Sequence, residues 1–275
     1  MLECQLSKAS IRYESIGEGI PLLVIHGFSC DHHYIQNDLE PLFVERAGWQ
    51  RIYIDLPGHG QSKWPAWISN EDQILDLLCE FINQVLPEKR FVLVGESWGG
   101  AFSLGIINRL GDLVDGLYLT VPYINLEGGE ESLPEHSVLV ENPAFMDHLQ
   151  AEDPDWAPDF LVVQDPGFID RLREDIYKVA KENEKQDLKW ENIFYSLSND
   201  PSKVFFNKPS LILTGRQDSV VGYQKAFELI ENFPRGTFAV LDRGGHYLSL
   251  EQQNLMHNLV NEWLDRVEES RGDKI

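Results

Sequence analysis

Short apolar runs recur along the chain and are separated by longer stretches of mixed polarity. Each run spans four or five residues and is rich in Val, Ile and Leu. Runs of this kind are typical of strands that are buried on both faces of a parallel sheet. We therefore predict six such strands, at residues 22–25, 51–54, 91–94, 117–121, 211–214 and 238–241. An antiparallel pair at residues 3–6 and 11–15 is expected to precede them.

Helical patterns lie between the predicted strands. In residues 70–86 apolar side chains recur every three or four positions, which predicts an amphipathic helix that Asn70 can cap. These side chains are Ile74, Leu77, Leu78, Phe81, Ile82 and Val85. Residues 223–233 and 248–267 show the same spacing near the end of the chain. Alternating strands and helices predict an α/β sheet protein.

The alternation breaks between residues 122 and 206. Prolines recur there, and acidic helical fragments such as residues 167–181 replace the strand-like runs. Regular alternation resumes at Pro209. Such a stretch is typical of an insertion that leaves the flanking strands as neighbours. We predict a core of residues 1–121 and 207–275, interrupted by a helical lid at residues 122–206.

The composition suits a folded globular enzyme, since 43% of the 275 residues are apolar. The longest apolar runs, such as residues 21–25, are far too short to span a bilayer. The first ten residues lack the pattern of a signal peptide, so a cytoplasmic location is expected. The three cysteines, Cys4, Cys30 and Cys79, are too scattered for a disulfide framework or a metal site. We expect them to be ordinary reduced thiols.

The chain carries a formal net charge of −22, and the charge is unevenly placed. Residues 122–206 contain 19 acidic and 7 basic side chains, which is −12 of the total. A field of this sign repels nucleic acid and anionic membranes. It would favour neutral or cationic ligands near this segment, or it is a solvated surface that keeps the protein in solution.

The strongest chemical signal is the motif Gly-Glu-Ser-Trp-Gly-Gly at residues 95–100. It directly follows a predicted strand and precedes a helical stretch at residues 101–110. A nucleophile on such a turn needs small neighbours, because the passage from strand to helix is tight and strained. Backbone N–H groups at the start of the helix then favour developing negative charge. Ser97 is therefore the predicted nucleophile.

A serine hydroxyl needs a base within hydrogen-bond reach. His246 follows two glycines in the loop after the last predicted strand, at the same edge of the sheet as Ser97. Asp218 follows the strand at residues 211–214 and completes the chain order Ser, Asp, His. The rival Asp242 is only four residues from His246, which is too close along the loop to face it. We predict His246 as the general base and Asp218 as the acid that orients it.

Two N–H donors are needed to stabilise the tetrahedral intermediate of acyl transfer. Trp98 would supply one, because it follows the nucleophile. Phe28 would supply the other, from the loop after the strand at residues 22–25, where Gly27 lets the backbone bend. Trp98 and Phe28 are the predicted oxyanion hole.

Other polar residues near the strand ends are interpreted as structural. They are His26, Asp55, His59 and Ser62. The last three lie in a tight turn at residues 55–62, which contains two glycines and a proline. His32 and His33 either border the pocket or open the next helix.

Together these motifs resemble those of the α/β-hydrolase superfamily in order and interval. They are His26-Gly27, residues 55–62, the Ser97 motif, Asp218 and Gly245-His246. The resemblance covers the core on both sides of the insertion. It implies a mostly parallel eight-stranded sheet with helices on both faces, a catalytic triad, and a helical lid inserted after the sixth strand.

The motifs exclude some subfamilies of the α/β-hydrolase superfamily but do not select a single one. Haloalkane dehalogenases and epoxide hydrolases carry aspartate where this chain has Ser97. Residues 97–100 and the acidic insertion resemble prolyl iminopeptidases, whose lid acids hold a substrate ammonium. Those enzymes have a glycine- and proline-rich oxyanion loop, whereas this chain has Gly-Phe-Ser-Cys at residues 27–30. Carbon–carbon bond hydrolases of ring-cleavage pathways share a similar elbow.

The favoured hypothesis is a serine hydrolase that cleaves a small carboxylic ester, thioester or lactone through an acyl-enzyme. It needs no metal or organic cofactor, and its expected partner is a small-molecule substrate rather than nucleic acid or a membrane. The alternatives are an aminopeptidase similar to prolyl iminopeptidases, a carbon–carbon bond hydrolase, and a ligand sensor on the same fold. The natural substrate and the oligomeric state are not predicted.

Overall fold

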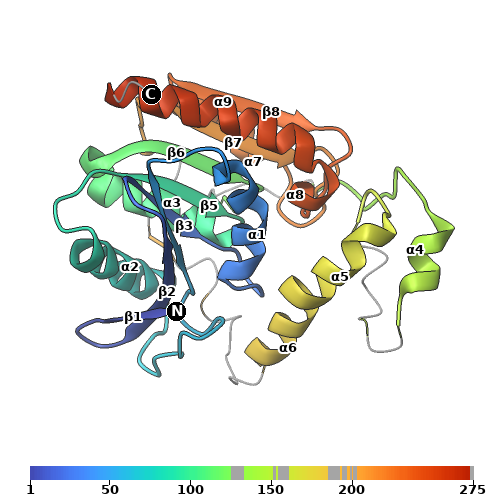
Figure 1. The fold of residues 1–275 in the computed structure, drawn as a ribbon, viewed down its shortest axis with the longest axis horizontal. Helices are drawn as coiled ribbons and strands as arrows, with labels where there is room; N and C mark the ends of the chain where they lie inside the picture. Colours follow the sequence, from blue (N-terminus) through green and yellow to red (C-terminus); the bar gives the residue numbers. More distant parts are fainter. Residues whose placement is uncertain are drawn as a thin grey trace.

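An eight-stranded sheet forms the centre of the computed structural model, in the order β1-β2-β4-β3-β5-β6-β7-β8 (Figure 1). The structure describes residues 1–124, 133–150, 153, 161–184, 193, 197–198, 200 and 203–272. The strands are β1 (Leu2–Gln5), β2 (Ser10–Ile16), β3 (Ile20–Ile25), β4 (Trp49–Ile54), β5 (Phe91–Glu96), β6 (Val114–Thr120), β7 (Ser210–Gly215) and β8 (Gly236–Leu241).

The first two strands run antiparallel to their neighbours, and the others are parallel. β2 pairs antiparallel with both β1 and β4. The pairs from β4 through β3, β5, β6 and β7 to β8 are all parallel. The mostly parallel sheet predicted above is confirmed. The carboxyl ends of six strands consequently meet at one edge, where an α/β sheet places its site.

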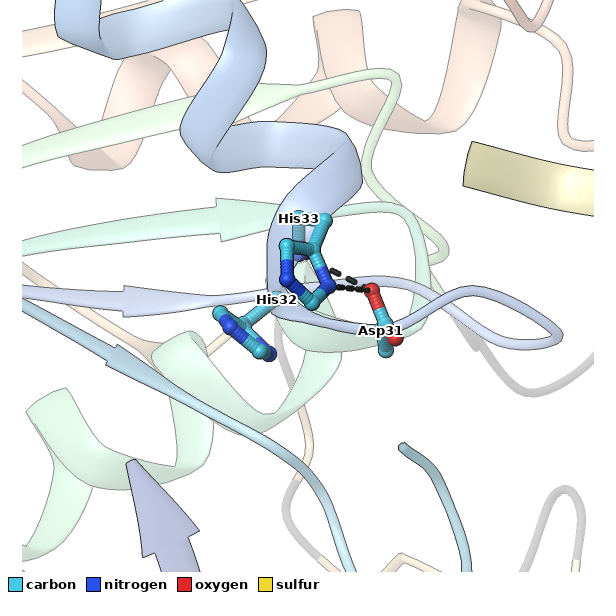
Figure 2. A group of neighbouring side chains, drawn as sticks. All are labelled: Asp31, His32 and His33. Atoms are coloured by element: carbon cyan, nitrogen blue, oxygen red, sulfur yellow. Dashed lines mark hydrogen bonds and ion pairs between the residues drawn. The ribbon is translucent and has the colours of Figure 1, made fainter. Parts of the chain in front are cut away.

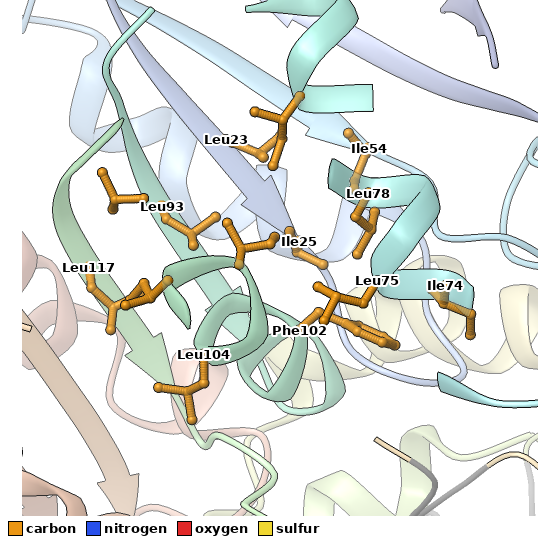
Figure 3. Close-up of a cluster of buried hydrophobic side chains, with 14 of the residues drawn as sticks. Leu23, Ile25, Ile54, Ile74, Leu75, Leu78, Leu93, Phe102, Leu104 and Leu117 are labelled. Atoms are coloured by element: carbon orange, nitrogen blue, oxygen red, sulfur yellow. The ribbon is translucent and has the colours of Figure 1, made fainter. Parts of the chain in front are cut away.

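The apolar runs are continuous because helices cover both faces of the sheet. On β3, Leu23 and Ile25 belong to the core on one face, and Leu22 and Val24 to the core on the other. Figure 3 shows the first of these cores, in which Leu75 of one helix and other apolar side chains pack against the strands.

Two long helices of the described part of the chain pack on each face. Helices α2 (Glu71–Val85) and α3 (Trp98–Leu110) pack on the face of Leu23. Helices α1 (His32–Phe43) and α9 (Gln253–Arg271) pack on the face of Leu22. The cap predicted for α2 is present, since Asn70 Oδ1 accepts from Gln73 N at 3.0 Å. Among the described helices, none combines the length and apolar character that crossing a bilayer requires.

Two of the predicted helices are interrupted. Residues 223–233 form α7 (Gln224–Glu228) followed by a 3₁₀ turn, Leu229–Asn232. Residues 248–267 form α8 (Leu248–Glu251) and then α9, because Gln252 leaves the helical region with φ −132° and ψ 36°. Apolar spacing alone did not indicate this break. The break at Gln252 separates α8, which follows the His246 loop, from α9 on the sheet.

Residues 122–206, called the cap segment below, connect β6 to β7. Its described helices are α4 (Pro143–His148), α5 (Ile169–Leu172), a π-helical turn (Arg173–Tyr177) and α6 (Lys178–Glu184). In Figure 1 α5 and α6 lie on the side nearer α1, and α4 lies beyond α5. Apolar side chains of the cap segment pack against Cys30, Tyr34 and Leu250 of the core. They are Phe145, Leu161, Ile169, Leu172, Ile176 and Tyr177. The cap segment thus contacts the residues that follow β3 and β8.

Candidate active site

Ser97 lies on a strained turn between β5 and α3, with φ 48° and ψ −115°. The neighbouring glycines have no room for a side chain. A Cβ on Gly95 would lie 2.3 Å from Ser103 Oγ, and a Cβ on Gly99 would lie 2.3 Å from the carbonyl oxygen of Ile25. The small residues of the motif therefore let the start of α3 approach the end of β3 closely. A positive φ strains the backbone of a non-glycine residue, and strained residues cluster at functional sites.

Gly99→Ala is expected to destabilise the fold, because the atom that the new methyl group meets is backbone and cannot rotate away. Overpacking of this kind costs about 1–3 kcal/mol or more of the free energy of unfolding. Thermal unfolding measures the effect. Gly111→Ala is the matched control, since a Cβ there would lie 3.6 Å from Ile107 Cγ2 in ordinary contact. Equal melting temperatures for the two variants would contradict the expectation.

The structure brings the three predicted side chains Ser97, His246 and Asp218 into one chain of hydrogen bonds. His246 Nε2 lies 3.1 Å from Ser97 Oγ. His246 Nδ1 lies 3.0 Å from Asp218 Oδ2. Because Asp218 accepts at Nδ1, the tautomer that this geometry favours leaves Nε2 able to take a proton from the serine.

Asp218 is fixed on its other oxygen. Its Oδ1 accepts from the backbone N–H groups of Val220 at 2.9 Å and Val221 at 3.0 Å. The side chain is fully buried, whereas the rival Asp242 is exposed. The turn after β7 therefore presents a single carboxylate oxygen to the imidazole.

His246 has a raised pKa. Burial lowers it, but the charge and hydrogen bond of Asp218 outweigh burial, with help from the charges of Glu96 and Glu251. The three carboxylates approach from different elements: the turn after β7, the end of β5, and α8. A base of this kind accepts a proton readily while it is neutral, and its function as a base is lost as pH falls through this raised pKa.

The two residues predicted to supply the oxyanion donors have their side chains in contact. Phe28 follows β3, and Trp98 is the first residue of α3. Their rings meet edge to face with centroids 5.8 Å apart. The Trp98 indole Nε1 donates to Glu71 Oε1 at 2.6 Å, which anchors the ring behind the turn. The structure thus brings the backbone of both residues to the same edge of the sheet as Ser97.

The residues interpreted as structural have structural partners. His26 Nε2 accepts from Leu56 N at 3.0 Å and joins the loops after β3 and β4. Asp55 Oδ2 accepts from Gln61 N at 2.8 Å, within the turn at residues 55–62. Burial lowers the pKa of His59 to about 3, so this imidazole is neutral at ordinary pH.

Glu96, inside the serine motif, was missed by the sequence analysis. Its Oε2 accepts from Gly27 N at 2.5 Å, which ties the Ser97 turn to the loop that carries Phe28. A Cβ on Gly27 would lie 2.3 Å from the same oxygen. Burial raises the pKa of Glu96 to about 7, while His246 and the Gly27 N–H lower it. The signal available in the sequence was an acidic residue two positions after the apolar run at residues 91–94.

Glu96→Gln is expected to move the acid limb of the kcat/KM profile slightly to lower pH, because a carboxyl with a pKa of about 7 carries only part of its charge there. The variant keeps an oxygen for Gly27 N but removes one of the charges that raise the pKa of His246. The base then stays neutral to lower pH. The measurement is kcat/KM against pH for one ester, with Glu228→Gln, at an exposed position on α7, as the control. An unchanged midpoint would contradict the role of Glu96.

One group of metal-ligand side chains gathers among the described residues: Asp31, His32 and His33, with ligand atoms within 4.8 Å of one another. Asp31 Oδ1 accepts from His33 N and lies 3.0 Å from His33 Nδ1, as the dashed lines in Figure 2 show. His32 Nδ1 lies 2.7 Å from Asp55 Oδ1. Asp31 is the N-cap of α1. These hydrogen bonds explain the cluster as the start of a helix.

Comparisons with known proteins place this geometry in context. A family described as "alpha/beta hydrolase fold" matches residues 20–253. The crystal structure of an alpha/beta superfamily hydrolase from Oenococcus oeni PSU-1 is 29% identical, with a TM-score of 0.83 over 98% of this chain and all of that one. A thermophilic esterase from Thermogutta terrifontis has the same fold, at 20% identity and a TM-score of 0.71 over 97% and 99% of the two chains. A pimeloyl-[acyl-carrier protein] methyl ester esterase from Legionella pneumophila is 24% identical over 93% of this chain and 99% of its own.

Proposed function

Because the chain belongs to the α/β-hydrolase fold family and is a hydrolase, we propose that it cleaves a small carboxylic ester, thioester or lactone through an acyl-enzyme. The observation that carries the proposal is the hydrogen-bond chain from Ser97 through His246 to Asp218. The esterase names of two similar proteins support an ester as the substrate class.

In the acylation step, Ser97 Oγ attacks the carbonyl carbon of the substrate and His246 Nε2 takes its proton. Asp218 stabilises the imidazolium that forms. The same imidazolium then returns the proton to the leaving alcohol or thiol, or to the ring oxygen of an opened lactone. A water molecule then attacks the acyl-enzyme with His246 again as the base, and the imidazolium returns this proton to Ser97 Oγ as the bond to the acyl group breaks and the acid is released.

The oxyanion of each tetrahedral intermediate would be stabilised by the backbone N–H groups of Phe28 and Trp98. Removing one such donor costs about 3 kcal/mol of transition-state stabilisation. The start of α3 adds a favourable dipole at the same place. Glu96 supports this arrangement, because it holds the Gly27 amide next to Phe28. The cap segment, residues 122–206, would act as the lid that shapes the substrate pocket.

Turnover of a panel of short-chain p-nitrophenyl esters, beside proline p-nitroanilide, tests the proposal. Ester cleavage by the wild type, with stoichiometric labelling of Ser97 by a fluorophosphonate, is the expected result. Cleavage of the proline amide alone would favour the aminopeptidase. Labelling without sustained turnover on any ester would move the assignment to a ligand sensor or a carbon–carbon bond hydrolase.

A further inference from the structure

Glu251 joins the cap segment to the loop that carries His246. It is the last residue of α8 and is 7% exposed. Its Oε2 accepts from Gly245 N at 2.6 Å, one residue before His246. Its Oε1 accepts from Val162 N at 2.5 Å and Val163 N at 3.3 Å. One buried carboxylate therefore has an oxygen on each side of the boundary between core and cap segment.

Glu71 makes an equivalent connection on the side of Ser97. It is the first residue of α2 and is 1% exposed. Its Oε1 accepts from the indole of Trp98 at 2.6 Å, one residue after Ser97. Its Oε2 accepts from Leu197 N, in the later part of the cap segment, at 2.9 Å.

The cap segment and the His246 loop also make a close van der Waals contact. A Cβ on Gly245 would lie 2.9 Å from Val162 Cγ2. Val162 and its neighbour Leu161 are fully buried. A shift of residues 161–163 against the loop would therefore break hydrogen bonds to Glu251 and also open a packed contact.

We propose that Glu71 and Glu251 are positioning residues that connect the cap segment to the backbone on either side of the catalytic pair Ser97 and His246. The inference rests on the proposed function for the roles of Ser97 and His246. Any movement of the cap segment is then transmitted to the nucleophile turn through Glu71 and to the base through Glu251. Substrate seated under the cap segment would stabilise the arrangement in which the two side chains react.

Substitution of each glutamate by glutamine disrupts one of its two sets of hydrogen bonds. A carboxylate accepts on both oxygens, whereas a glutamine amide accepts on one and donates on the other. In Glu251→Gln either Gly245 N or Val162 N must therefore face an NH₂ group. In Glu71→Gln the same conflict falls between the Trp98 indole and Leu197 N. Each variant keeps the volume of the side chain and removes one connection.

The experiment compares Glu71→Gln, Glu251→Gln and their combination with Glu262→Gln, a surface control on α9 that faces Arg266. Amide hydrogen exchange is measured in the intact protein, together with kcat, KM and the pH profile for one ester. In Glu251→Gln we expect faster exchange in residues 161–163 and 244–246 together. We also expect kcat to fall on the order of 10²-fold, since small misplacements of reacting groups have effects of that size.

The acid limb gives a readout that loosened packing alone does not move. Glu251 is one of the charges that raise the pKa of His246, beside Asp218 and Glu96, so the midpoint is expected to shift to lower pH in Glu251→Gln. In Glu71→Gln the fluorophosphonate labelling rate of Ser97 should fall while the midpoint stays in place.

Two results would overturn the inference. The first is faster exchange confined to the cap segment, together with a higher KM and an unchanged kcat. This result would mean that the cap segment has loosened without any effect on Ser97 or His246. The second is exchange and kinetics equal to those of Glu262→Gln. If the wild type cleaves no ester, the proposed function fails, but the paired change in hydrogen exchange still tests the connection.

Discussion

Ser97→Ala is expected to lower kcat for a short-chain p-nitrophenyl ester on the order of 10⁶-fold, to the level left by binding and the oxyanion donors. The variant removes Ser97 Oγ, the atom that lies 3.1 Å from His246 Nε2 and that would form the acyl-enzyme. Ser97 is the cap residue of α3 but makes no capping hydrogen bond through its side chain, so the fold should be retained. Steady-state kinetics and a melting curve on the same preparation measure both effects.

Ser69→Ala, which changes an exposed serine before α2, is the control for this variant. It should match the wild type in kcat and in fluorophosphonate labelling. Ester turnover by Ser97→Ala within tenfold of the wild type would remove the acyl-enzyme mechanism.

Asp218→Asn is expected to lower kcat on the order of 10⁴-fold through the wrong imidazole tautomer. The amide oxygen of the new side chain would keep the two N–H donors of Val220 and Val221, because both of those groups require an acceptor. Its NH₂ group would then face His246 Nδ1 and oblige that nitrogen to accept. The imidazole proton would move to Nε2, which could no longer take the proton of Ser97.

Asp242→Asn is the matched control, since Asp242 is the other aspartate near His246 in the chain and is exposed. Its kcat should equal that of the wild type. If Asp242→Asn were the impaired variant and Asp218→Asn were active, the assignment of the acid would be reversed. Measuring kcat at several pH values excludes a simple displacement of the pH optimum.

Much of the sheet was predictable because its signal is local. Residues 22–25 are apolar at every position, and each side chain of this run is buried on one face or the other. The serine motif could also be recognised in the sequence, since steric crowding at Gly95 and Gly99 confines both positions to small residues. Ser97, Asp218 and His246 follow β5, β7 and β8, and the parallel sheet brings the carboxyl ends of these strands to one edge.

The supporting carboxylates were not predictable by the same reasoning. Glu251 meets Val162 across 89 positions of the chain, and Glu71 meets Leu197 across 126. Their cap-segment partners are main-chain amides, which leave no mark on the sequence. The non-helical backbone at Gln252 was missed because the apolar spacing of residues 248–267 continues through it.

The use of main-chain amides has a consequence for how the protein can diverge. Every amino acid except proline carries the N–H group that Val162, Val163 and Leu197 offer. Under the proposed lid role, mutations elsewhere in residues 122–206 would alter which substrates are accepted while these hydrogen bonds to the core persist. Proline at any of these three positions would remove a hydrogen bond to Glu71 or Glu251, so changes of specificity are expected to come from other positions of the segment.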